Sequence, residues 1–265
     1  MKVCLLGCGA IGQTIAENSG KKYRLIAVFD KNVNKAEEVA KISSAEVAKS
    51  FDDFLNYCKN CDVAVEAASQ QAVRDCVRIL EFTDLVIMSV GALRDAELLN
   101  KLISTARASG RKIHIPSGAV GGIDALKAVK GLAEEVTLTS VKHPESLKDS
   151  YFFKEKRIKV ENIKERTVLF DGNAMEAVKF FPANVNVAAT VSLACLGFKR
   201  TRVRIIADPG VRENYHEIRA KGSFGELCIV AKNKKHPKNP KTSYLAALSV
   251  VRLLREMAEE MRVGT

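Results

Sequence analysis

Short apolar runs alternate with segments of helical periodicity along the first 116 residues of the chain. The runs are apolar along their whole length, which is typical of strands buried on both faces. Strands that alternate with helices predict βαβ units and a parallel sheet covered by helices. The expected strands are 3–6, 25–29, 46–48, 63–66, 85–89 and 112–115, and the expected helices are 11–18, 34–41, 52–57, 69–80 and 95–108.

After Pro116 the pattern changes to apolar and polar residues in alternation, which suits an antiparallel sheet with one wetter face. We expect strands at 136–141, 202–206 and 226–230, and helices at 123–129, 174–181 and 185–196. A last helical pattern at 242–262 carries apolar residues on one face. The pattern predicts an α/β chain: a doubly wound, Rossmann-type domain at 1–116, an α+β domain with a mostly antiparallel sheet at 117–240, and a segment 241–265 that packs back on the first domain.

The first strand runs into the spacing G-x-G-x-x-G at Gly7, Gly9 and Gly12. Gly7 allows the tight turn, Gly9 lets the backbone approach a pyrophosphate, and Gly12 lets the following helix pack on the strand. Unpaired N–H groups at the start of that helix favour phosphate. We therefore expect cofactor contacts from this turn, including the intervening Ala10 and Ile11.

Asp30 ends the second strand, 23 residues after Gly7. An acidic residue roughly 20 residues after the first glycine binds the ribose hydroxyls of NAD and repels the 2′-phosphate of NADP. Lys31 and Lys35 can offset that repulsion. The sequence predicts NAD as the preferred cofactor, with NADP tolerated.

Composition narrows the class of protein. The chain of 265 residues is 47% hydrophobic and holds no apolar run near the ~20 residues that span a bilayer. Its first residues form a strand rather than a targeting signal, so we expect a cytoplasmic protein without membrane contact. The net charge of +11 suits nucleic acid or small anions. The densest basic run, 232–241, lacks interleaved aromatic residues, which favours a solvated loop over a nucleic-acid surface.

The seven cysteines are odd in number and several lie in apolar runs, which fits a reducing compartment. Cys58 and Cys61 have C-x-x-C spacing. No second pair or suitably placed histidine completes a zinc site, so we favour a helix end over metal or redox chemistry and expect no metal.

Four histidines can serve as a proton acceptor: His114, His143, His216 and His236. His114 lies inside an apolar strand and His236 in the basic run, whereas His143 ends a strand and stays possible. His216 lies in a polar stretch, expected to connect two strands of the second domain. A cleft between domains is where a group with a pKa near neutrality is useful, so spacing makes His216 a candidate proton acceptor.

Four motifs together resemble the L-aspartate dehydrogenases of archaea and bacteria. They are GCGAIG at 7–12, SGAVGGIDAL at 117–126, FPANVNVAAT at 181–190 and DPGVRENYHEIRAKGSFGE at 208–226. The last two are more specific than the glycine turn, and the resemblance covers nearly the whole chain. It implies a Rossmann domain, a second α+β domain, an NAD or NADP cofactor and a homodimer.

The resemblance also implies residue roles. His216 corresponds to the catalytic histidine, and Ala119 and Asn186 correspond to cofactor contacts. The reaction implied is oxidation of L-aspartate to iminoaspartate, which is hydrolysed to oxaloacetate and ammonia or is released as a precursor of the pyridine ring. Gly121, Gly122 and Asn186 are candidates for binding the substrate carboxylates.

Two other interpretations stay open from the sequence. One is a dehydrogenase or reductase of the same architecture that acts on another amino acid, a semialdehyde or a cyclic imine, because fold alone does not fix the substrate. The other is a non-catalytic nucleotide sensor. His216 and the absence of a recognisable DNA-reading helix argue for an enzyme with a small-molecule substrate and against nucleic acid.

Overall fold

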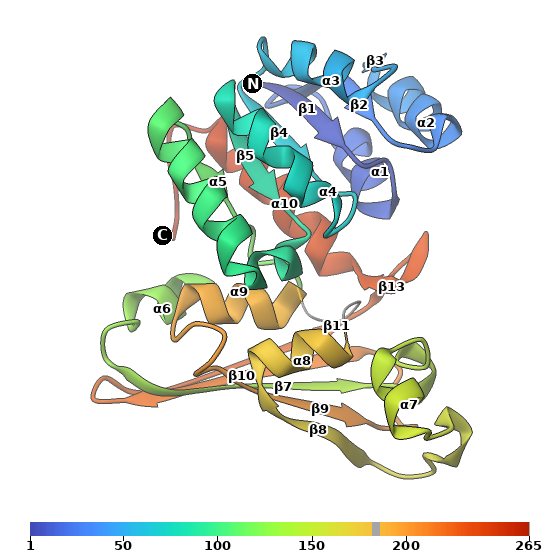
Figure 1. Ribbon diagram of the computed structural model, residues 1–265, viewed down its shortest axis with the longest axis vertical. Coiled ribbons are helices and arrows are strands. Elements are labelled where there is room, and N and C mark those ends of the chain that lie inside the picture. The colour runs from blue at the N-terminus through green and yellow to red at the C-terminus, as the bar shows by residue number, and fades with distance from the viewer. Residues whose placement is uncertain (182–185, 265) are drawn as a thin grey trace. The chain divides into compact units, whose positions relative to one another are not determined.

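The chain folds into two compact units. The structure is a computed structural model that describes residues 1–181 and 186–264. Unit 1 comprises Met1–Pro116 together with Ala246–Thr265, and unit 2 comprises Ser117–Leu245. Helices and strands of both are labelled in Figure 1. Residues 182–185, which include part of the FPANVNVAAT motif and the start of the helix expected at 185–196, lie outside the described residues.

Unit 1 is built on a six-stranded sheet in the order β3-β2-β1-β4-β5-β6, and every strand pair is parallel. This is the strand order of the dinucleotide-binding fold, so the prediction of a doubly wound sheet is confirmed. The strands are β1 (Lys2–Leu6), β2 (Arg24–Phe29), β3 (Glu46–Val47), β4 (Val63–Glu66), β5 (Asp84–Ile87) and β6 (Ile113–His114).

Helices cover both faces of this sheet (Figure 1). They are α1 (Ala10–Glu17), α2 (Val33–Ser43), α3 (Phe51–Cys58), α4 (Ala72–Asp75), α5 (Ala96–Ser109) and α10 (Tyr244–Met257), with 3₁₀ turns η1 (Cys76–Glu81) and η2 (Val90–Arg94). The single helix expected at 69–80 is wrong: α4 lasts one turn and tightens into η1. Short 3₁₀ pieces of this kind are common next to α-helices.

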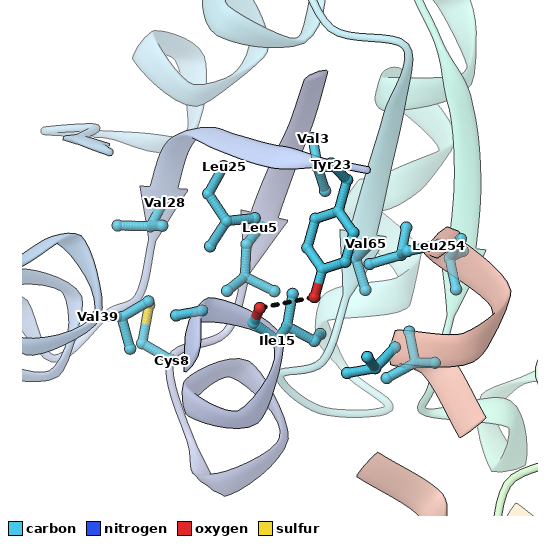
Figure 2. Packing of buried hydrophobic residues seen from close by; sticks show 14 of the residues in the cluster. Val3, Leu5, Cys8, Ile15, Tyr23, Leu25, Val28, Val39, Val65 and Leu254 are labelled. Atoms are coloured by element: carbon cyan, nitrogen blue, oxygen red, sulfur yellow. Dashed lines mark hydrogen bonds between the residues drawn. The ribbon is translucent and has the colours of Figure 1, made fainter. Parts of the chain in front are cut away.

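The core on one face of the sheet joins α1, α2 and α10 to the strands (Figure 2). Val3 and Leu5 of β1 pack there with Ile15 of α1 and Leu254 of α10, all with no more than a trace of exposed surface. The buried Tyr23 hydroxyl donates to the carbonyl oxygen of Ile15 at 2.8 Å, so this polar group has a hydrogen-bond partner inside the apolar cluster. The strands that lead to the glycine turn are therefore packed against helices on this face.

Unit 2 contains a five-stranded sheet in the order β11-β10-β7-β9-β8. The β7–β9 pair is parallel and the other three pairs are antiparallel, so the prediction of a mostly antiparallel sheet is confirmed. The strands are β7 (Ala133–Lys142), β8 (Thr167–Asn173), β9 (Arg202–Ala207), β10 (Asn214–Gly222) and β11 (Gly225–Asn233).

Helices of unit 2 lie on one face of that sheet (Figure 1). They are α6 (Ile123–Ala128), α7 (Tyr151–Lys156), α8 (Ala174–Phe180) and α9 (Asn186–Ala194), with η3 (Pro144–Ser146) and η4 (Val160–Asn162). The expectation of a plain loop at 232–241 is wrong. That run completes β11 and forms a ribbon of β12 (Lys235–His236) and β13 (Asn239–Ser243), anchored by buried His236 against Tyr244.

Candidate functional site

The turn after β1 has the geometry that its glycines predict. Gly7 has φ of +102°, and an added Cβ would lie 2.5 Å from the backbone of Ala67 and Ala68. Gly12 is as constrained, because its Cβ would overlap the carbonyl oxygen of Gly7. The turn is thus closed tightly against the end of β4 and against α1, and only glycine fits at either position.

Gly9 is the opposite case. It caps α1 without a side chain, and an added Cβ would meet nothing within 4 Å. Ala10 and Ile11 follow as the first residues of α1, where backbone N–H groups have no partner inside the helix. The open backbone at Gly9 and the N-terminus of α1 fit a phosphate group.

Asp30 lies directly after β2, next to this turn. Its Oδ2 accepts from the Cys8 backbone N–H and its Oδ1 from the Asn32 backbone N–H, both at 2.8 Å. The two bonds fix the carboxylate beside the glycine turn, and an ionised carboxylate has acceptor capacity for further hydroxyl groups. The arrangement suits a ribose.

Glu66, the last residue of β4, belongs to none of the sequence motifs and has no exposed surface. Its carboxylate accepts from the backbone N–H groups of Ala68, Ser69 and Ser89 and from the Ser89 hydroxyl, at 2.8–3.0 Å. Burial raises the pKa of this carboxyl group, although the hydrogen bonds act to lower it. Glu66 ties the carboxyl ends of β4 and β5 together, and the only signal for it in the sequence was a charged residue closing an apolar strand.

His216 is not in a connection between strands, as the sequence interpretation expected, but inside β10, where it pairs with Ser140 of β7 and Ala231 of β11. It is 2% exposed. Its Nδ1 lies 2.9 Å from the Ser140 hydroxyl oxygen. The inward positions at the start of β10 are occupied by polar residues. The sequence therefore lacks the alternation of apolar and polar residues that identifies a strand.

Lys142 lies two residues beyond Ser140 on β7, so both side chains point to the face that holds His216. The Lys142 side chain is buried, which lowers its pKa from 10.5 to about 8. Burial, and then the charge of Lys142, lower the pKa of His216 from 6.5 to about 3. At neutral pH the imidazole is therefore uncharged and Lys142 largely carries the positive charge.

Two buried asparagines extend this group. Asn214 of β10 faces Asn233 of β11, and the Asn233 amide donates to the carbonyl oxygen of Ala119 at 2.7 Å. We call the residues Ser140, Lys142, Asn214, His216 and Asn233 the polar cluster. Ala119 is thereby held beside the strand pair that carries His216.

The loop that leads into α6 also packs on β11. Gly122 has φ of +66°, and an added Cβ would lie 2.4 Å from the Ile229 side chain. Gly121 is exposed, and Asn186 begins α9 with an exposed side chain. The structure therefore brings Ala119 and Gly122 to the strands beside His216.

Comparison with known proteins gives full-length matches. The L-aspartate dehydrogenase of Methanococcoides burtonii is 42% identical over 275 residues, and that of Methanocaldococcus jannaschii is 41% identical over 272; each match covers 100% of both chains. The chain belongs to the L-aspartate dehydrogenase family. The crystal structure of aspartate dehydrogenase from Thermotoga maritima superimposes with a TM-score of 0.80 at 27% identity, covering 100% of this chain and 99% of that one.

Two family models each match a different part of this chain, and each part contains one of the sites described above. Residues 7–116 match "Homoserine dehydrogenase, NAD binding domain", which includes the glycine turn and Asp30. Residues 124–257 match "Aspartate dehydrogenase, C-terminal", which includes the polar cluster. A pyridine nucleotide is the cofactor class that these matches support. Within the described residues, no helix has the length and apolar character needed to cross a bilayer.

Proposed function

We propose that this protein catalyses the oxidative deamination of L-aspartate with a pyridine nucleotide, and so supplies a precursor for pyridine nucleotide synthesis. The observation that carries the proposal is the full-length similarity to L-aspartate dehydrogenases, at 42% identity for the Methanococcoides burtonii protein. The polar cluster supports it, because it places a buried, uncharged imidazole beside a buried ammonium group.

The nucleotide subsite is assigned to unit 1. Gly7, Gly9 and Gly12, with Ala10 and Ile11 at the start of α1, would hold the pyrophosphate, and Asp30 the adenosine ribose. When bound, the nicotinamide ring accepts a hydride. The carboxylate of Asp30 favours NAD, while exposed Lys31 and Lys35 allow NADP. Ala119 and Asn186 are proposed as further cofactor contacts.

His216 is proposed as the base. L-Aspartate is bound with a protonated amine, and one proton must leave before the Cα–H bond breaks to give an imine. In the tautomer whose Nδ1–H donates to Ser140, Nε2 carries the lone pair that accepts this proton. After that proton has passed to solvent, the same nitrogen can take a proton from the water that adds to the imine and give it to the amine that leaves, which yields oxaloacetate and ammonia.

Lys142 is proposed to bind a substrate carboxylate. Its ammonium group is buried, so an arriving carboxylate meets it with little screening by water. The two negative charges of aspartate would raise the pKa of both Lys142 and His216, which lets His216 keep the proton that it accepts. Gly121, Gly122 and Asn186 are proposed as the other substrate contacts.

We also propose a homodimer. The sheet face of unit 2 that points away from its helices carries the partly exposed Tyr215 and Glu217 and the exposed Arg219, and Val168 and Val230 are each 49% exposed. Light scattering should give twice the 29.0 kDa mass of one chain, and the pair of changes Val168→Glu and Val230→Glu should shift the protein toward the monomer. A monomeric wild type would contradict this.

The function is tested by following reduction of NAD and of NADP with a panel of amino acids: L-aspartate, D-aspartate, L-asparagine, L-glutamate and L-alanine. We expect turnover with L-aspartate and loss of about 10²–10⁴-fold in kcat for His216→Ala, the range for removing a general base. His114→Gln, a histidine of unit 1 beside Asp84, is the matched control and should keep activity. Preference for another amino acid, or full activity in His216→Ala, would contradict the proposal.

A further inference from the structure

Three cysteine sulfurs meet inside unit 1, away from the glycine turn. The sulfur atoms of Cys4, Cys58 and Cys61 all lie within 4.8 Å of one another. Cys4 is in the middle of β1, Cys58 is the last residue of α3, and Cys61 lies in the turn that follows. The C-x-x-C pair, interpreted from sequence as a plain helix end, thus gains a third sulfur from a strand 54 residues earlier in the chain.

The backbone fixes all three positions. Cys4 points to the opposite face of the sheet from Val3 and Leu5, toward α3. In the turn after α3, the Cys61 N–H donates to the Cys58 carbonyl oxygen at 3.4 Å. The Asp62 N–H then donates to the Lys2 carbonyl oxygen of β1 at 2.9 Å. The three sulfurs therefore converge from a strand, a helix end and a turn, as the ligands of a single metal ion do.

We propose that Cys4, Cys58 and Cys61 bind a thiophilic divalent cation, with Zn²⁺ as the ion that fits best. Thiolate sulfur selects such cations, and three protein ligands with one open position is an established zinc arrangement. Cys61 is only partly buried, which leaves a side for water as the fourth ligand. A divalent ion with three thiolates leaves one net negative charge, whereas Cu⁺ would leave two in a largely buried place.

The local electrostatics support a cation. Cys58 ends α3, where the helix dipole favours positive charge and disfavours an unpaired thiolate. A thiol binds a metal ion as the thiolate, so binding of the ion must release protons.

The test uses the full-length protein, purified under reducing, anaerobic conditions and stripped of metal. Titration with Co²⁺ alone should give a thiolate-to-cobalt charge-transfer band and strong visible bands that saturate at one ion per chain, and Zn²⁺ should displace them. Cys61→Ser should weaken binding by more than about 100-fold, beyond the cost of losing an outer-shell partner. Cys228→Ser makes the same chemical change at the exposed cysteine and should leave the spectrum unchanged.

Stability gives a second measurement. Saturating Zn²⁺ should raise the melting temperature of the wild type and of Cys228→Ser but not of Cys61→Ser, because an ion that binds only the folded chain stabilises it. Cys4→Ala, which removes the ligand from β1, provides a second variant if Cys61→Ser folds poorly. Absence of the cobalt bands in the wild type, their persistence in Cys61→Ser, or a disulfide among these cysteines in the anaerobic protein would overturn the proposal.

Discussion

The glycine turn of unit 1 and the polar cluster of unit 2 are built in different ways. The turn offers backbone N–H groups from consecutive residues, and its glycines serve to keep side chains out. The cluster offers side chains from three strands, and Ser140 and His216 meet across 76 positions of the chain. The first kind of site tolerates no added volume at Gly7 and Gly12, whereas the second depends on charge in a buried place. Each can therefore be perturbed by a change that should leave the other intact.

The largest expected effect separates two glycines of the same turn. Gly7→Ala combines an unfavourable φ of +102° with overlap against the backbone of Ala67 and Ala68. It should lower the free energy of unfolding by more than about 3 kcal/mol. Gly9→Ala has free space for its Cβ, so it should fold like the wild type but bind the nucleotide more weakly. Urea denaturation and nucleotide titration measure the two effects, and equal stability of the two variants would contradict the structure.

In the polar cluster, Lys142→Met should raise the KM for L-aspartate by about 10–100-fold, since a charged hydrogen bond contributes about 1.5–3 kcal/mol. The KM for the nucleotide should stay near that of the wild type. Removing the charge also raises the pKa of His216, so the acidic limb of the pH–rate profile should move to higher pH. Lys221→Met, an exposed lysine of β10, serves as the control. A change confined to the nucleotide KM would assign Lys142 to the other subsite.

The pH dependence of stability reports on the burial of His216. Its pKa is about 3 in the folded chain against 6.5 unperturbed, so the unfolded chain binds more protons between these values. The contribution is therefore complete above pH 6.5 and is lost as pH falls toward 3, and it amounts to about 2 kcal/mol between pH 7 and pH 5. Urea denaturation at both pH values should show a smaller decrease for His216→Gln than for the wild type. Equal decreases would mean that His216 titrates like an exposed histidine.

The smallest effect concerns the choice of cofactor. Asp30→Ser should lower the ratio of kcat/KM for NAD to that for NADP by about tenfold. The change removes a favourable contact with the ribose hydroxyls of NAD and a repulsion of the 2′-phosphate of NADP. Asp52→Ser is the control, because Asp52 is an exposed aspartate that pairs with Arg78 on the surface. An unchanged ratio in Asp30→Ser would remove Asp30 from the account of cofactor preference.

The two sites also differ in how far the sequence reveals them. The roles of Gly7 and Gly12 could be predicted because the G-x-G-x-x-G spacing that identifies them lies within six residues. The close approach of Ala67 and Ala68 to Gly7 could not be predicted from that spacing. The parallel sheet followed from wholly apolar strands. The place of His216 could not be predicted, because Asn214 and His216 occupy inward positions that a strand pattern expects to be apolar. The sequence also could not predict the surroundings of Lys142 and Glu66 or the contact of Cys4 with Cys58. These depend on residues that are distant in the chain and become neighbours only in the folded structure.

The central claim is that His216 serves the chemistry while the glycine turn binds the nucleotide. The most direct measurement is the dissociation constant of the nucleotide for His216→Ala, determined by titration without substrate, beside its kcat with L-aspartate. We expect a dissociation constant within about twofold of the wild type and a kcat lower by about 10²–10⁴-fold. A dissociation constant that rises as far as kcat falls would contradict it, because His216 would then act through nucleotide binding.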